Sequence, residues 1–178
     1  KLNLADGRGA ALVSFKDVAL DEDSTLSGGI ELLEHIADRV RAVLSAEMLG
    51  SSIQAFETTV EYLKTRVQFG HVIGSFQALQ HRAAAMLGKI ELSRSVVEAA
   101  LTAIDQGREN VPMLVSAAKA KVGDTYHLIS NEMVQMHGGI GMTDEHDAGL
   151  YLKRARVTEA MFGNQSFHRD RYGRLDGY

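Results

Sequence analysis

Gly29–Arg66 reads GIELLEHIADRVRAVLSAEMLGSSIQAFETTVEYLKTR, and this stretch decides the fold. Its apolar residues recur at steps of three and four: Leu33, Ile36, Val40, Val43, Leu44, Met48, Phe56, Val60 and Leu63. That spacing is typical of an α-helix with one apolar face. The stretch therefore predicts a long amphipathic helix that begins near Gly29, with a break between Gly70 and Gly74 after its end.

Two further helices are predicted downstream of this break. One runs from Ser75 to about Asp105, and its apolar stripe is Leu79, Met86, Ile90, Val97, Leu101 and Ile104. A glycine at position 107 follows and suits a helix end. The next helix begins near Pro112, the only proline, because proline fits the first turn of a helix, and it continues through Val134.

A glycine run at 138–141 ends the third helix, and the pattern then predicts a fourth. Thr143 is placed to cap a helix from about Asp144 to Met161. The tail after Gly163 is polar, with two aromatic anchors, Phe167 and Tyr172. Four long helices joined by short connections predict an all-α domain, an antiparallel four-helix bundle.

The first 28 residues follow a different pattern. Apolar residues alternate at Ala11, Val13 and Phe15, which predicts a strand from Ala10 to Val18, and a second short strand ends near Leu20. Two strands alone are only marginally stable. We therefore expect residues 1–28 to be the end of a middle β-domain that begins upstream, and residues 29–178 to form the helical domain.

Composition excludes several classes of function. The net charge is −4 and no basic run occurs, so we expect no nucleic-acid partner. There is no cysteine, which excludes disulfides and thiol nucleophiles within these residues. No apolar run is long enough to cross a bilayer, and Lys1–Gly9 lack the features of a signal or transit peptide. We therefore expect a cytoplasmic protein without a membrane span.

The sequence does not fit two kinds of site that occur in proteins with similar motifs. Di-iron sites in helix bundles need Glu-x-x-His pairs, and Glu31 and Glu34 precede His35 at the wrong spacing, so we expect no metal site. The Gly138-Gly-Ile-Gly141 run is not a dinucleotide fingerprint, because a helix rather than a strand precedes it. It is either a helix-ending turn or a loop that admits a flat or anionic ligand.

A cation and an aromatic residue end the first helix. Arg66 can bind phosphate bidentately, and Phe69 offers a face for stacking. The alternative is a cation that only complements the helix dipole at the C-terminus.

These motifs resemble a known family when they are taken together. The patterns Tyr62-x-x-x-Arg-x-x-Phe-Gly-x-x-Ile-x-x-x-Gln77 and Gln135-x-x-Gly-Gly-x-Gly141 are similar to the C-terminal domain of acyl-CoA dehydrogenases. The opening Ala11–Asp21 resembles the end of that family's middle β-domain. Members also have an N-terminal helical domain and more of the β-domain, so we expect this chain to be a fragment or a processed piece.

The resemblance implies a flavin cofactor and a shared site. Members oxidise acyl-CoA thioesters to trans-2-enoyl products and pass a hydride to FAD, which lies across a subunit interface. It implies an acyl-CoA substrate, a second dehydrogenase subunit and an electron-transfer acceptor as partners. The matching cofactor positions are Arg66, Gln68 and Phe69 for pyrophosphate and adenine, Gln77 near the flavin, and Gln135, Gly138 and Gly139 on the adenine side. Gln68 departs from the family, where a hydroxyl residue is common.

The family's catalytic glutamate has no counterpart here. Its usual position is occupied by Phe162, and the second position used by some members is Val40, followed by Arg41. Neither Phe162 nor Val40 can accept a proton, although the main-chain N–H at Phe162 can still polarise a thioester carbonyl. Arg41 and Phe162 remain substrate positions by this match. Glu159, three residues before Phe162 on the predicted helix, is the one replacement base, unless it is simply an exposed helix carboxylate.

The sequence therefore predicts an FAD-binding acyl-CoA dehydrogenase subunit without its own catalytic base, which contributes FAD contacts within a heteromer. Members with one base-deficient subunit include enzymes that act on bulky steroid side-chain thioesters, which favours a bulky acyl group. Two alternatives stay open. The first is a homomeric dehydrogenase that uses Glu159 as a relocated base. The second is a non-enzymatic bundle used for assembly.

Overall fold

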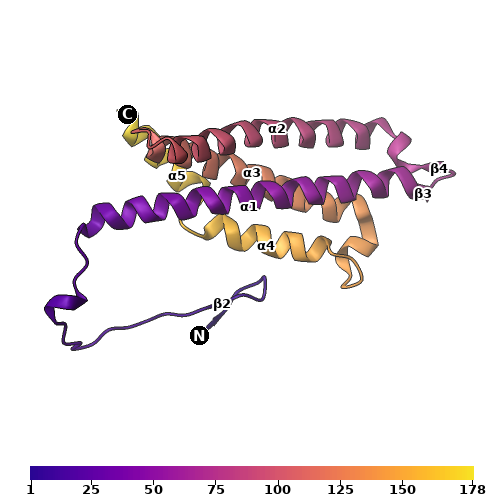
Figure 1. Ribbon diagram of the computed structural model, residues 1–178. Coiled ribbons are helices and arrows are strands. Elements are labelled where there is room, and N and C mark those ends of the chain that lie inside the picture. Colours follow the sequence, from indigo (N-terminus) through magenta and orange to yellow (C-terminus); the bar gives the residue numbers. More distant parts are fainter.

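The computed structural model of the protein describes residues 1–178, and helices dominate it (Figure 1). The helices are α1 Gly29–Thr65, α2 Gln77–Asp105, α3 Val111–His137, α4 Ala148–Ala160 and α5 Gln165–Leu175. The strands are β1 Leu2–Asn3, β2 Gly9–Ala10, β3 Val67–Gln68 and β4 His71–Val72, and short 3-10 turns are η1 Glu22–Ser24, η2 Ile73–Ser75 and η3 Gly138–Met142. The predicted all-α four-helix bundle is confirmed, with a fifth helix added at its end.

Helix α3 lies at the centre of the bundle and contacts each of the other four helices. The largest buried side chains include Tyr126, Met48, Met86, Ile90, Ile129 and Met133, while alanines let the helices approach one another closely. Pro112 lies in the first turn of α3, as predicted, since a first-turn N–H has no helical partner to lose. Helices α1 to α4 run antiparallel in succession, so the connections between them gather at the two ends of the bundle (Figure 1).

The start of α4 differs from the prediction. The helix begins at Ala148 with Asp147 as its N-cap residue, so Thr143 does not cap it. Instead, the glycine run continues beyond α3 as η3, and the Thr143 hydroxyl donates to the carbonyl of Ile140 at 2.8 Å. The prediction failed because Thr143 ends the 3-10 turn η3 and does not start α4.

The polar tail after Gly163 is in fact helix α5. Asn164 caps the helix by accepting the N–H of Phe167 at 2.9 Å. The predicted aromatic anchors are partly exposed, whereas His168 is fully buried. Periodicity of apolar residues could not detect this helix, because polar side chains fix it to the bundle.

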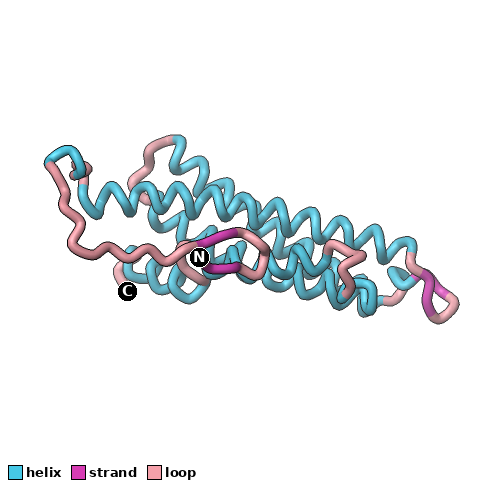
Figure 2. The backbone as a smooth tube through the Cα atoms, turned by 90° about the horizontal axis from the view of Figure 1, so that it is seen from below, coloured by secondary structure: helices cyan, strands magenta, loops and turns pink.

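The N-terminal segment leaves the bundle as an extended loop (Figure 2). Leu2 pairs with Ala10 and Asn3 with Gly9 in an antiparallel hairpin, but the predicted strand from Ala10 to Val18 is not formed beyond Ala10. Alternation produces a strand only where another strand pairs with its main chain, and no other segment of residues 1–178 does so. The division into two domains near residue 28 stays a prediction.

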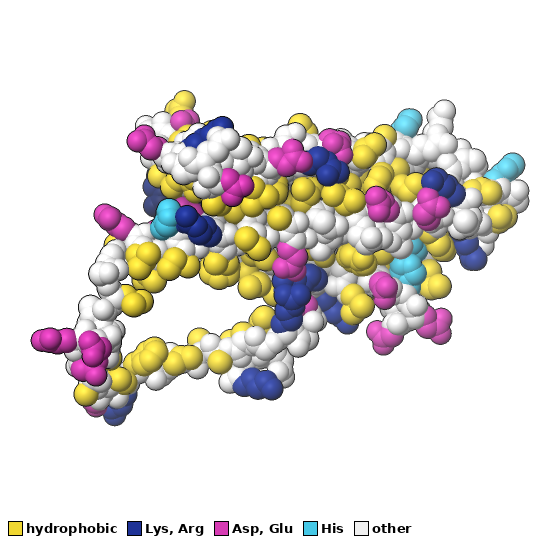
Figure 3. Space-filling model, in the orientation of Figure 1, with side chains coloured by type: hydrophobic (Ala, Val, Ile, Leu, Met, Phe, Trp, Pro, Cys, Tyr) yellow, Lys and Arg dark blue, Asp and Glu magenta, His cyan; other side chains and the backbone are white.

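Apolar side chains line both this segment and the first half of α1 (Figure 3). The exposed ones are Leu12, Val13, Phe15, Val18 and Leu20 on the segment, and Ile30, Leu33, Ile36, Val40 and Val43 on α1. Neither row is covered by another part of residues 1–178. None of the helices has the length and hydropathy that a bilayer crossing requires.

Candidate functional site

The predicted site residues form two groups, which lie toward opposite ends of the bundle. The cofactor positions lie where α1 ends, α2 begins and α3 ends, beside the β3–β4 hairpin (Figure 1). Val40, Arg41 and Phe162 lie toward the other end. The 25 residues from Arg41 to Arg66 run along α1, which at about 1.5 Å per residue separates the two positions by about 38 Å.

A tight hairpin carries Phe69, the aromatic residue among the predicted cofactor positions. Strands β3 and β4 pair Gln68 with His71, which leaves Phe69 and Gly70 as the two turn residues, both with positive φ, at +54° and +77°. The ring of Phe69 is 87% exposed and meets Phe76 edge to face at 6.4 Å between centroids. The turn therefore presents a flat apolar ring to a ligand.

Arg66 sits at the base of this hairpin, directly after α1. No carboxylate lies within ion-pair distance of its guanidinium, in contrast to most other arginines of the chain. The side chain is exposed, so its donors can bind an anionic group. Gln77, in the first turn of α2, is exposed at the same end.

Tyr62 and His137 join the hairpin end of α1 to the glycine run. The Tyr62 hydroxyl donates to the carbonyl of His137 at 3.3 Å, and the two rings lie 4.3 Å apart. The His137 ring also lies 4.2 Å from that of His146. Burial lowers the pKa of His137, whose Nδ1–H donates to the carbonyl of Met133 at 2.7 Å. The structure thus places the end of α1, just before Arg66, beside the start of the glycine run.

The glycines of η3 differ in what surrounds them. A Cβ atom at Gly138 or Gly139 would meet no atom within 4 Å, and φ at Gly138 is +63°. A Cβ atom at Gly141 would lie 2.8 Å from the carbonyl oxygen of Val134. Gly141 is therefore required by packing, whereas Gly138 and Gly139 leave an open main chain that a ligand can approach. Gln135, one turn earlier, is exposed beside them.

The two predicted base positions line one pocket at the other end. This pocket of about 360 Å³ lies between α1 and the turn after α4, and its apolar lining is Val40, Val43, Leu44, Met161 and Phe162. Val40 and Phe162 thus line the same pocket although 122 positions separate them in the sequence. Neither supplies a carboxylate.

The pocket contains one acidic residue, Glu47, which the sequence did not single out. Its Oε1 accepts from Arg154 Nε at 2.7 Å and lies 2.6 Å from Arg154 Nη2. Arg154 also pairs with Asp6 at 2.6 Å, which attaches the N-terminal hairpin to α4. Glu47 is thus part of an ion-pair network rather than an isolated carboxylate.

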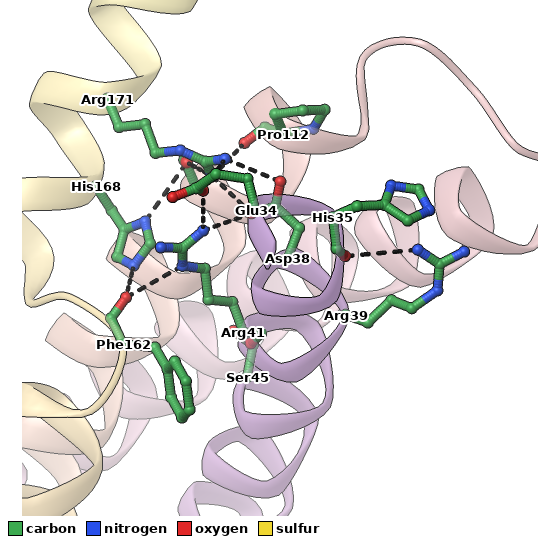
Figure 4. Close-up of polar contacts among 11 residues, drawn as sticks. Glu34, His35, Asp38, Arg39, Arg41, Ser45, Pro112, Phe162, His168 and Arg171 are labelled. Atoms are coloured by element: carbon green, nitrogen blue, oxygen red, sulfur yellow. Dashed lines mark hydrogen bonds and ion pairs between the residues drawn. The ribbon is translucent and has the colours of Figure 1, made fainter. Parts of the chain in front are cut away.

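Phe162 itself has an unusual main-chain conformation. Its φ is +56° and that of Gly163 is +106°, so the chain makes a left-handed turn directly after α4. The carbonyl of Phe162 accepts from Arg41 Nε at 3.2 Å and from His168 Nε2 at 3.1 Å (Figure 4). Lys119 Nζ donates to the carbonyl of Gly163 at 3.0 Å and to two carbonyls at the end of α4.

A buried ion-pair network lies behind this turn. Asp38 accepts from Arg41 at 2.9 Å and from both terminal nitrogens of Arg171 at 2.7 and 2.8 Å (Figure 4). Arg171 also donates to the Ser116 hydroxyl at 3.0 Å, which lies 3.4 Å from Nδ1 of His168. Asp38 is therefore held by Arg41 and Arg171 and does not line the pocket.

Burial lowers the pKa of two side chains near this turn, His168 and Lys119. It lowers the pKa of His168 to about 4, with the charge of Lys119 acting in the same direction. His168 is thus neutral at pH 7, with its proton on the Nε2 atom that donates to Phe162. Burial likewise lowers the pKa of Lys119 to about 8, so this side chain is still mostly protonated at pH 7.

Glu159 does not lie where the sequence suggested. The predicted helix was expected to continue to Met161, but α4 ends at Ala160 and the chain then turns, so Glu159 and Phe162 do not share a helix face. Its Oε1 lies 2.6 Å from His127 Nδ1 and accepts from Gln165 at 3.1 Å, in a different pocket. It is also largely buried, at 14% side-chain exposure, rather than an exposed carboxylate.

Comparisons with known proteins identify the family to which the chain is similar. The family model described as acyl-CoA dehydrogenase, C-terminal domain, matches residues 27–175. The acyl-CoA dehydrogenase IpdE2 of Mycolicibacterium smegmatis is 38% identical over 130 residues, which is 72% of this chain and 39% of that protein. The chain therefore spans well under half the length of this relative.

Two solved structures resemble the fold. The structure of PigA with FAD and proline has a TM-score of 0.75 at 26% identity, covering 79% of this chain and 37% of that chain. The ChsE4–ChsE5 complex from Mycobacterium tuberculosis has a TM-score of 0.91 at 23% identity, covering 99% and 48%. This second likeness extends to nearly every residue here, but at that identity it concerns the fold alone.

Proposed function

This chain belongs to the acyl-CoA dehydrogenase family, and from that membership we propose that it is an FAD-binding subunit that leaves α-proton abstraction to a partner subunit. The observation that carries the proposal is the pocket shared by Val40 and Phe162. Both positions predicted for the family's glutamate line this one pocket, and neither holds an acid. Abstraction of an α-proton needs a carboxylate within hydrogen-bond reach, and such proton transfer typically contributes about 10²–10⁴-fold.

The hairpin end fits the adenosine diphosphate half of FAD. Arg66 offers a guanidinium without a carboxylate partner, which suits a diphosphate, and the exposed ring of Phe69 suits an adenine. Gly138 and Gly139 have room for a ligand at their main chain. The exposed amides that would complete the site are those of Gln68, Gln77 and Gln135. When bound, FAD accepts the hydride of the dehydrogenation.

The length of α1 supports a cofactor shared between subunits. Arg66 and the pocket beside Arg41 are about 38 Å apart along the helix, so one cofactor does not serve both ends. The hairpin end would therefore hold FAD whose reactive ring lies in the pocket of another subunit. This is the contribution that the chain makes to a catalytic partner.

The pocket end can still bind an acyl thioester. Its apolar lining suits a bulky acyl group, such as a steroid side chain, and the buried Arg41 and His168 side chains behind the turn fix the main chain at Phe162. A main-chain N–H at this position can donate to a thioester carbonyl. Without a base the bound thioester keeps its α-proton. The electrons taken up in the partner's pocket would pass to an electron-transfer acceptor.

The pocket also favours one alternative, a self-sufficient dehydrogenase whose base is Glu47. This residue supplies the one carboxylate of the pocket lining. Its ion pair with Arg154 opposes the role, because an arginine neighbour stabilises the charged form and weakens the base. Glu159, the replacement base considered from the sequence, lies in a different pocket and gains no support.

The test is to purify the full-length protein alone and together with a co-expressed dehydrogenase homologue that retains its glutamate. We expect flavin absorbance and dye-linked dehydrogenation of acyl-CoA only in the assembled complex, and loss of turnover when the partner's glutamate becomes glutamine. Robust turnover by this protein alone, abolished by Glu47→Gln, would overturn the proposal. A stable complex without any flavin would instead identify an assembly bundle.

A further inference from the structure

The turn that presents residue 162 to the pocket is held by three buried side chains from three helices. Arg41 of α1, Lys119 of α3 and His168 of α5 are 6%, 1% and 0% exposed. A buried charge or ring nitrogen is costly unless its hydrogen bonds are made. All three side chains direct donors at the carbonyls of Phe162 or Gly163. The carbonyls of the turn are therefore important hydrogen-bond acceptors for these three buried side chains.

The hydrogen bonds form a closed circuit whose donors and acceptors all match. Arg171 donates to Asp38 and to Ser116, and the Ser116 hydroxyl is left to donate to Nδ1 of His168. This arrangement fixes the His168 proton on Nε2, from which it is donated to the carbonyl of Phe162. Arg41 closes the circuit by donating to both Phe162 and Asp38.

The turn needs such support because its conformation is unfavourable. A non-glycine residue rarely adopts positive φ, and Phe162 does so at +56°. The glycine that follows is required for the approach of α5: a Cβ atom at Gly163 would lie 2.3 Å from the Phe167 ring and 2.9 Å from His168 Nε2. Glycine at 163 thus lets His168 reach the carbonyl of the preceding residue.

None of these hydrogen bonds involves the Phe162 side chain. We propose that Lys119 and His168 are positioning residues that hold the Phe162–Gly163 turn by its main-chain carbonyls and so direct the side chain at position 162 into the pocket, whatever that side chain is. The inference deepens the proposed function, because it concerns the pocket assigned there to the acyl group. Its test requires neither flavin nor turnover.

The experiment places 4-fluorophenylalanine at position 162 of the full-length protein by amber suppression and records its fluorine NMR spectrum. We expect one dispersed resonance in the parent protein. His168→Phe and Lys119→Met remove the donors, and we expect the population of a second, solvent-like resonance to rise about tenfold, the effect of losing one hydrogen bond to a charged or buried group. His168→Gln keeps a side-chain N–H near the Nε2 position and should restore the single resonance.

Arg174→Met on the same helix is the matched control, because Arg174 pairs only with the exposed Asp170. An unchanged fluorine spectrum in folded His168→Phe and Lys119→Met proteins would overturn the inference, as would an equal change in the control. If these variants do not fold, Ser116→Ala decides, since it removes only the hydroxyl between Arg171 and His168. A second resonance is expected there, and its absence refutes the positioning role. Failure of FAD binding, by contrast, leaves this spectrum unaffected.

Discussion

Replacement of Arg171 by methionine should release α5 from the bundle. The Asp38 side chain is 4% exposed, and its Oδ2 atom accepts only from Arg171, at 2.8 Å. Removing one partner of a buried ion pair typically costs about 3–5 kcal/mol. Because Arg41 still neutralises Asp38, we expect the lower value, about 3 kcal/mol. Methionine retains most of the apolar stem, so lost packing contributes little.

Hydrogen exchange of peptides covering residues 161–175, followed by mass spectrometry in the full-length protein, measures this effect directly. A loss of about 3 kcal/mol corresponds to exchange about 100-fold faster through local opening. Arg174→Met, which breaks a pair whose side chains are 63% and 65% exposed, should accelerate exchange by less than about fivefold. An acceleration in Arg171→Met no larger than in this control would refute the assignment of the network as the attachment of α5.

Four other outcomes are expected. Arg66→Ala should weaken FAD binding by the assembled protein about 10- to 100-fold, measured by flavin fluorescence, because a charged hydrogen-bond donor is lost. Gly141→Ala should lower the free energy of unfolding by about 1–3 kcal/mol in thermal denaturation, because the added Cβ would lie 2.8 Å from a main-chain oxygen. Gly139→Ala, whose Cβ would meet no atom, should leave stability unchanged and weaken FAD binding. Phe162→Glu should raise dye-linked turnover of a complex whose partner has lost its base by about 10²–10⁴-fold, since the turn would direct a carboxylate into the pocket. The pKa of His168 is lowered to about 4 in the folded protein, from 6.5, so between these pH values only the unfolded state binds the extra proton. The contribution of His168 to stability is therefore full above about pH 6.5 and falls by about 2–3 kcal/mol as the pH drops to 4. His168→Gln should remove this loss, measured by denaturation as a function of pH.

The long helices could be predicted because their apolar residues decide their packing. Helix α1 begins at Gly29 and α2 ends at Asp105, where the periodicity placed them. Helix α5 could not be found in this way. It is attached by the polar side chains of His168 and Arg171, and a pattern of apolar residues carries no signal for a helix that is held in this way. The strand at Ala10–Val18 failed for the opposite reason, since its pattern was correct but no segment pairs with it.

Some of the site residues could likewise be predicted from the sequence, and others could not. Arg66, Phe69 and Gly138 could be singled out because a cation, an exposed ring and a glycine run are chemically conspicuous in a sequence. Lys119 and His168 could not, because the acceptors to which they donate are main-chain carbonyls, which every residue has. Glu47 was missed because its partner Arg154 and the pocket residues Met161 and Phe162 come from a segment distant in the chain. Only the fold shows that these side chains converge.

The way in which the turn is held explains how a base can be absent without damage to the fold. If a carboxylate at position 162 had been the partner of Arg41 or Lys119, its replacement by phenylalanine would have left a buried charge unpaired, at a cost of about 3–5 kcal/mol. Here Arg41 is neutralised by Asp38, and Lys119 is bonded to three carbonyls, so the side chain of Phe162 is free to change. Stability and cofactor binding therefore place little constraint on this one position, whereas proton abstraction depends on it entirely. A folded subunit that binds FAD and lacks a base is thus a physically consistent state of this bundle.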